Sequence, residues 1–119
     1  SMLNKVKYIR ECLIAVASAE TAYSVEFYDS TKSPLHGHCF ASAYVIQCLL
    51  GGEILTGTVN GERHGWNRID GVEFDVTSCQ FGGDGLTPLA KGKIWLQPKK
   101  INPRFLKLKE RVDFEMKVI

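Results

Sequence analysis

The 119-residue sequence has no apolar run close to the roughly 20 residues that a membrane-spanning helix requires, so we expect no membrane association. Its glycines form neither a GxGxxG nor a GxxxxGK pattern, so no phosphate-binding loop is predicted. Internal repeats and linkers are lacking as well. Because 45% of the residues are apolar and 24% are charged, the composition is typical of a globular protein rather than a disordered one.

Cysteine pairs of the CxxC type are also missing, and the four cysteines have no spacing typical of a disulfide scaffold. We therefore expect free thiols and a reducing compartment, the cytoplasm. Cys12 and Cys48 lie within apolar helical patterns, where we expect buried thiols that serve packing.

The N-terminus begins basic and turns apolar, as a signal peptide does, but its apolar run is short and lies between Glu11 and Glu20. Apolar residues instead recur at intervals of three and four, which predicts an amphipathic helix over residues 3 to about 20. Ser1 ahead of Met2 is typical of a residue left by tag removal, so we expect a single domain over residues 2–119.

Charge is distributed unevenly along the chain. Residues 1–90 carry six Lys/Arg against ten Asp/Glu, whereas residues 91–119 carry nine against three. A basic segment can bind nucleic acid or another acidic partner. Apolar residues at helical spacing separate some of these basic residues, which favours a solvated helix face, and we expect no nucleic-acid partner.

The stretch "CFASAYVIQCLL" (residues 39–50) is apolar on all sides, which predicts a central, buried helix that ends at Gly51-Gly52. Residues 24–37 and 82–93 contain the turn-forming residues of loops. The remaining segments predict strands at 53–59, 63–69, 72–78 and 94–98, and a last helix from Asn102-Pro103 to Ile119. Two helices, a small antiparallel sheet and a third helix make an α+β domain.

Asp70-Gly71 is typical of a two-residue hairpin turn and fixes the pairing of the second and third strands, with Ile69 opposite Val72. Alternation along the strands then places the following side chains on one face: His64, Trp66, Glu73, Asp75 and Thr77. His64 and Asp75 become diagonal neighbours within hydrogen-bonding reach, and Asn67 points to the opposite face. A carboxylate beside an imidazole fixes its tautomer and stabilises its protonated form.

Cys39 opens the predicted apolar helix. The unpaired N–H groups and the dipole of a helix N-terminus favour a thiolate, and a nearby imidazolium adds to this effect. If the hairpin packs against the start of this helix, Cys39, His64 and Asp75 form a nucleophile, a base and an orienting group. The alternative is that Cys39 is a small core residue, His64 a surface residue and Asp75 the partner of a nearby arginine.

The segments "GHCFASAYVIQCLLGGEIL" and "HGWNRIDGVEFDVTSCQF" resemble the bacterial YunG-like family, with its pattern G-Q-C, an apolar helix, G-G-E-I-L, H-x-W-N-R, a D-G turn, D-x-T and Q-F. The match spans residues 37–81. This family is more distantly similar to papain-like and transglutaminase-like cysteine enzymes, which place Cys on a helix and His with Asp or Asn on adjacent strands. The resemblance implies Cys39 as nucleophile, His64 as base and Asp75 as orienting residue. It also implies the following site-lining residues: Trp66, Asn67, Thr77 and Gln80.

The sequence departs from the family pattern at His38, which replaces the glutamine before the cysteine. A glutamine amide at that point can donate a hydrogen bond to an oxyanion, and a neutral histidine can donate too, with different geometry and charge. His38 is therefore a candidate oxyanion or site-lining residue. The backbone N–H of Cys39 is a second donor that does not depend on this substitution.

A metal site is an alternative hypothesis, because nitrogen and sulfur ligands are offered by His36, His38, Cys39 and His64. The cluster lacks the C-x-x-C or H-x(3–5)-H spacing of zinc sites, so we expect neither a metal nor another cofactor. A third reading is a non-catalytic binding or regulatory protein on the same fold, whose basic C-terminal segment meets an acidic partner.

We therefore expect a papain-like or transglutaminase-like cysteine enzyme that forms a thioester through Cys39. Amidases, peptidases, deamidases and transglutaminases share this intermediate, so the substrate is expected to be a peptide, a protein or a small amide. A domain of this size offers a shallow cleft, which a second copy or a protein partner would complete.

Overall fold

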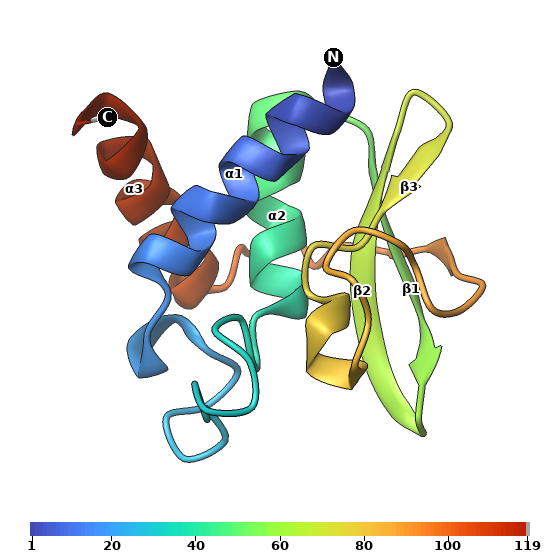
Figure 1. The fold of residues 1–119 in the computed structure, drawn as a ribbon, viewed down its shortest axis with the longest axis horizontal. Coiled ribbons are helices and arrows are strands. Elements are labelled where there is room, and N and C mark those ends of the chain that lie inside the picture. The colour runs from blue at the N-terminus through green and yellow to red at the C-terminus, as the bar shows by residue number, and fades with distance from the viewer. Residues whose placement is uncertain (119) are drawn as a thin grey trace.

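The computed structural model describes residues 1–118 of the chain, and its three helices and four strands confirm an α+β fold (Figure 1). In chain order the elements are α1 (Met2–Val16), the short 3-10 helix η1 (Ala19–Thr21), α2 (Cys39–Leu50), β1 (Glu53–Val59), β2 (Glu62–Ile69), β3 (Val72–Phe74), the 3-10 helix η2 (Ser78–Phe81), β4 (Lys93–Ile94) and α3 (Pro103–Val118). No helix within these 118 residues is long and apolar enough to cross a membrane.

The four strands form an antiparallel sheet in the order β3-β2-β1-β4. Two tight turns join the first three strands. Asn60-Gly61 links β1 to β2 with φ angles of 50° and 77°, and Asp70-Gly71 links β2 to β3 with φ angles of 50° and 79°. Positive φ at both central positions is the geometry that matches the right-handed twist of paired strands, and Asn-Gly and Asp-Gly adopt it readily. The pairing of Ile69 with Val72 is the predicted one.

Helix α2 lies in the middle of the molecule, between the sheet and the pair α1 and α3 (Figure 1). Its buried positions confirm the predicted central helix and are Ala41, Ser42, Ala43, Val45 and Ile46. Gly51, with φ of 78°, follows the last turn, as predicted from the glycine pair. At the other end, a Cβ on Gly65 of β2 would lie 2.6 Å from the Phe40 ring, so this glycine allows the start of α2 to approach the sheet closely.

The two outer helices bury apolar stripes against α2. From α1 these are Val6, Ile9, Cys12 and Leu13, and from α3 they are Leu108 and Val112. The stripes were predicted from residue spacing, and so was the buried thiol of Cys12. Ile119, the last residue of the predicted C-terminal helix, lies outside the described residues.

Four details of the predicted layout are wrong. Helix α1 ends at Val16 rather than near residue 20, because the side chains of Ser18 and Thr21 bond to each other's backbone N–H groups and begin η1 instead. The thiol of Cys48 is exposed, because the outer face of the last turns of α2 faces solvent. Strand β4 comprises only Lys93 and Ile94 rather than residues 94–98.

The fourth correction concerns the strand predicted at 72–78. Its pairing with β2 stops at Phe74, because the backbone N–H of Asp75 donates to the Leu86 carbonyl, at 2.7 Å, and not to β2. The chain then turns, with the N–H of Ser78 bonded to the Asp75 carbonyl. Asp75 and Thr77 therefore follow the sheet edge in a turn rather than in a ladder.

Candidate active site

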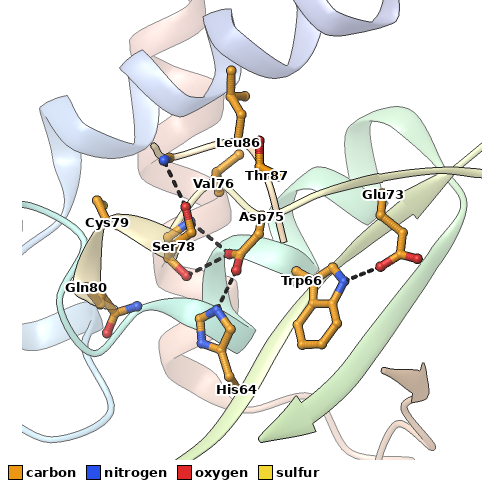
Figure 2. Close-up of polar contacts among 12 residues, drawn as sticks. His64, Trp66, Glu73, Asp75, Val76, Ser78, Cys79, Gln80, Leu86 and Thr87 are labelled. Atoms are coloured by element: carbon orange, nitrogen blue, oxygen red, sulfur yellow. Dashed lines mark hydrogen bonds and ion pairs between the residues drawn. The ribbon is translucent and has the colours of Figure 1, made fainter. Parts of the chain in front are cut away.

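His64 and Asp75 form a buried, hydrogen-bonded pair. The Nε2 atom of His64 lies 2.8 Å from Oδ2 of Asp75, and each side chain is only 1% exposed (Figure 2). His64 comes from β2, whereas Asp75 comes from the turn that follows β3. The turn brings the carboxylate to the imidazole although the strand pairing expected there does not form.

Asp75 is oriented by the turn that contains it. Its second oxygen, Oδ1, accepts hydrogen bonds from the backbone N–H and the hydroxyl of Thr77, at 3.2 and 3.4 Å. A carboxylate whose other oxygen is fixed in this way presents Oδ2 to the ring in one direction. Thr77 is itself buried, so it serves as a support for Asp75 and does not contact the solvent.

The imidazole of His64 is held in its protonated form. Burial of the ring lowers the pKa of His64, but hydrogen bonds to Asp75 and Cys39 and the negative charge of these two groups outweigh burial and raise the pKa to about 9. Because Nε2 is bonded to the carboxylate, Nδ1 is the ring nitrogen that remains for the Cys39 thiol. The ring also packs edge-on against Phe81, with the ring centroids 5.0 Å apart.

Cys39 is the first residue of α2 and is half-buried. Within the described chain, the backbone N–H groups of Cys39, Phe40 and Ala41 have no hydrogen-bond partner, as is usual in the first turn of a helix. These N–H groups point out of the helix end beside the thiol, and their partial positive charge favours an anion there. The thiol is thus adjacent to two stabilisers of negative charge, the helix end and the His64 imidazolium.

Cys39 and His64 both line one cavity of about 380 Å³. Its walls are contributed by α2, β2, η2, the loop before α2 and the start of α3. A reacting group that enters this cavity therefore meets the thiol and the imidazole together. One of the lining residues, Tyr23 in the loop before α2, is 70% exposed.

Gln80 supplies a further polar group to this cavity. Its Oε1 accepts a hydrogen bond from the backbone N–H of Gly37 at 3.0 Å. Because an N–H can only donate, this bond identifies the amide atom that faces Gly37 as the oxygen and the other as the nitrogen. The opposite end, Nε2, is buried and has no partner among residues 1–118. Buried amide groups are normally hydrogen-bonded, so a donor left without a partner in a cavity is the kind of group that a ligand satisfies.

His38 is held away from the cavity, in contrast to the role suggested for it. Its side chain is fully buried and both ring nitrogens are occupied: Nδ1 donates to the His36 carbonyl at 2.8 Å and Nε2 accepts from the Thr21 hydroxyl at 2.7 Å. Burial is the largest influence on the pKa of His38 and lowers it, consistent with a neutral ring. His38 therefore connects the start of α2 to η1 and has no free donor for an oxyanion.

Trp66 and Asn67 also lie next to the site without facing the cavity. Trp66 stacks near the His64 ring, with centroids 5.8 Å apart, and its indole N–H donates to Glu73 at 2.8 Å (Figure 2). Asn67 points the other way and donates its amide to the Ala43 carbonyl of α2 at 2.9 Å. Trp66 thus supports the histidine, and Asn67 ties β2 to α2.

The ligands of the rival metal site are not gathered in one place. Within residues 1–118, no three of the His, Cys, Asp and Glu side chains are grouped so that they could hold a metal ion. His36 lies in the loop before α2, where its Nδ1 accepts the backbone N–H of Asp29 and its ring stacks on Phe27.

Several residues of the cavity had no signal in the sequence. They come from the loop before α2, from the β4 region and from the start of α3, and include Tyr23, Phe27, Trp95, Arg104 and Phe105. Each is far from the hairpin along the chain, and no spacing rule connects them to Cys39. Arg104 and Phe105 reach the site only because α3 packs beside α2.

Comparison with known families gives one match. The model of the family described as YunG protein covers residues 5–117, almost the whole chain. The chain therefore belongs to this family, as the two sequence segments indicated. No curated protein and no solved structure matches the chain.

Proposed function

We propose that this YunG-family protein is a cysteine enzyme that transfers acyl groups through a thioester on Cys39. The observation that carries the proposal is a thiol at a helix N-terminus and an imidazole that line the same cavity, with a buried carboxylate 2.8 Å from that imidazole. A nucleophile, a base and a group that orients the base are what covalent acyl transfer requires.

The first half of the reaction uses the ion pair of Cys39 and His64. The thiolate attacks the carbonyl carbon of an amide, a sulfur–carbon bond forms, and the carbonyl oxygen becomes an oxyanion. When the tetrahedral intermediate collapses, the carbon–nitrogen bond breaks and the leaving amine takes the proton from the His64 imidazolium. Asp75 keeps Nε2 protonated throughout, so that Nδ1 is the nitrogen that exchanges the proton.

The second half releases the acyl group. Neutral His64 takes a proton from water or from an acceptor amine, which attacks the thioester carbonyl. The carbon–sulfur bond breaks, and the products are a carboxylic acid or a new amide, with the Cys39 thiolate and the imidazolium restored. Hydrolysis and transfer differ only in the nucleophile of this step.

Two donors are available for the oxyanion. The backbone N–H of Cys39 is unpartnered at the helix end, and the Gln80 Nε2 is buried without a partner at the same cavity. Donors that are fixed before the reaction stabilise the developing charge without reorganisation. Gln80, and not His38, is thus the side chain that donates a hydrogen bond to the oxyanion.

The arrangement also supports the finer interpretation of a papain-like or transglutaminase-like core. In that layout a nucleophilic cysteine begins a central helix and its histidine comes from an adjacent sheet, as Cys39 and His64 do here. The free thiols of all four cysteines favour a reducing compartment such as the cytoplasm.

The test is alkylation by iodoacetamide, followed cysteine by cysteine by mass spectrometry between pH 6 and 9. Cys48 is an exposed thiol and serves as an internal reference in the same sample. We expect Cys39 to react at least about tenfold faster than Cys48 at pH 6.5, because the helix end and the adjacent His64 ring activate its sulfur as a nucleophile.

The variant His64→Gln removes the imidazolium and keeps a polar side chain of similar size. In this variant we expect the rate at Cys39 to fall to that of Cys48 or below. If Cys39 of the unaltered protein instead follows Cys48 in parallel over the whole pH range, the enzymatic proposal is wrong and a binding role on the same fold takes its place.

A further inference from the structure

We propose that the substrate of this site carries a carboxylate beside an aromatic or aliphatic group, and that Arg104 binds this carboxylate. The inference rests on the proposed function and adds the chemical class of the molecule that the site acts upon. Arg104 belongs to the first turn of α3 and lines the cavity that contains Cys39 and His64.

The cavity offers an apolar surface around the thiol. Its aromatic lining residues come from five separate segments of the chain and are Tyr23, Phe27, Phe40, Phe81, Trp95 and Phe105. Two of them are unusually exposed for aromatic side chains, Tyr23 at 70% and Phe27 at 44%. Exposed aromatic groups gathered at the mouth of one cavity are typical of a surface that a ligand covers.

The two walls of the cavity differ in charge. On the β2 side Arg63 is accompanied by Glu62, so this wall carries both signs. On the α3 side Arg104 has no acidic companion among the described lining residues, and the cavity's other polar residue there is Asn102. A substrate anion is therefore attracted to the α3 wall.

Arg104 is also free to bind an anion. No carboxylate within residues 1–118 lies at ion-pairing distance from its guanidinium. The group instead lies over the ring of Tyr23, 5.9 Å from the ring centre. Stacking of this kind holds a guanidinium in place, and its N–H groups can bind a carboxylate through two hydrogen bonds.

The positive charge continues beyond Arg104. A second cavity, of about 580 Å³, shares Trp95, Asn102, Arg104 and Phe105 with the first and adds Lys100. The hollow that begins at Cys39 thus extends past Arg104 toward another cation, and no acidic residue among residues 1–118 lines this second part. A chain with an acidic group close to its scissile amide fits this arrangement, whereas a basic chain is repelled.

The experiment uses two matched electrophiles, N-chloroacetyl-phenylalanine and its carboxamide. In both, the Cys39 thiolate displaces chloride, so that a sulfur–carbon bond forms and a carbon–chlorine bond breaks. The two probes differ only in the carboxylate. At pH 7 and constant ionic strength we expect Cys39 to react with the acid at least about tenfold faster than with the amide, since charge-assisted bonds to arginine are among the strongest.

The deciding comparison is between Arg104→Gln and Lys117→Gln, each of which removes one positive charge from α3. Arg104→Gln is expected to reduce the preference for the acid to within about twofold, and Arg104→Lys to keep part of it. Lys117→Gln, at the exposed far end of the same helix, is expected to keep the full preference.

The outcomes separate the two proposals. If Cys39 reacts with neither probe faster than Cys48 does, the proposed function fails. If Cys39 reacts rapidly with both probes but the preference for the acid is absent, or survives in Arg104→Gln, the nucleophile stands and the proposed substrate class is wrong.

Discussion

Replacing Asp75 by Asn changes the site by a single charge and almost no volume. Oδ1 of the new amide can still accept from Thr77, as the carboxylate does at 3.2 Å. The amide nitrogen then faces Nε2 of His64 and can only donate to it. The imidazole must therefore place its hydrogen on Nδ1, which is the nitrogen that should accept a proton from Cys39.

The magnitude follows from the balance of influences on His64. Burial is the largest single influence and lowers its pKa, and the bonds and charges of Asp75 and Cys39 raise it to about 9. Without the charge of Asp75 we expect the pKa of His64 to fall by about 2.5 units or more, to near or below the usual 6.5, a loss of roughly 3 kcal/mol for the imidazolium. At pH 7.5 the protonated fraction then falls from nearly all to about a tenth or less.

Nitrogen-detected NMR of the three histidine rings measures both effects, because it reports the pKa and the tautomer of each ring separately. His36 and His38 serve as internal references, since neither contacts Asp75 in the structure. We expect His64 in Asp75→Asn to titrate near or below 6.5 with its hydrogen on Nδ1. An unchanged pKa near 9, or an unchanged tautomer, would refute the role given to Asp75.

Three other predictions concern the helix, the pH dependence and the oxyanion donor. Ile46→Ala, at a fully buried position of α2, should lower the free energy of unfolding by about 2 to 5 kcal/mol in urea titrations, and a change near zero would contradict the central place of α2. In the unaltered protein the raised pKa of His64 stabilises the fold below pH 6.5, and this contribution is lost as the pH rises toward 9. Stability should therefore fall between pH 7 and 9, by at most about 1.4 kcal/mol per pH unit, and a His64→Gln variant that shows the same fall would contradict this. Gln80→Leu should lower turnover of an ester or amide substrate by roughly 100- to 1000-fold while leaving the iodoacetamide rate of Cys39 within about threefold, because alkylation forms no oxyanion; equal losses in both assays would point to a structural role instead.

Local patterns were enough to predict the elements that carry the site. The apolar run of α2 and its two closing glycines defined the helix to the residue, and Asp70-Gly71 fixed the pairing of β2 with β3, which ends at Phe74, directly before Asp75. These features depend on neighbours in the sequence, such as turn geometry and helix ends. The Asn60-Gly61 turn, which joins β1 to β2, carries the same kind of signal.

The remaining features depend on contacts between distant segments. The early end of β3 results from the hydrogen bond between Asp75 and Leu86, and the spacing of residues 72–78 gave no sign of it. The burial of His38 depends on its bond to Thr21, and the free amide of Gln80 depends on its bond to Gly37. Arg104 reaches the cavity only because α3 packs beside α2.

The central claim is that Cys39 forms and releases a thioester, and reaction with 4-nitrophenyl acetate tests it directly. The release of nitrophenol is followed in time, and the acetyl group is located by peptide mass spectrometry in the unaltered protein and in Cys39→Ser. The account predicts a burst of about one nitrophenol per chain, with acetyl on Cys39 that is lost on standing, and no burst in Cys39→Ser. Acetyl that accumulates on Cys48 as fast as on Cys39, or that stays on Cys39 without being released, would contradict it.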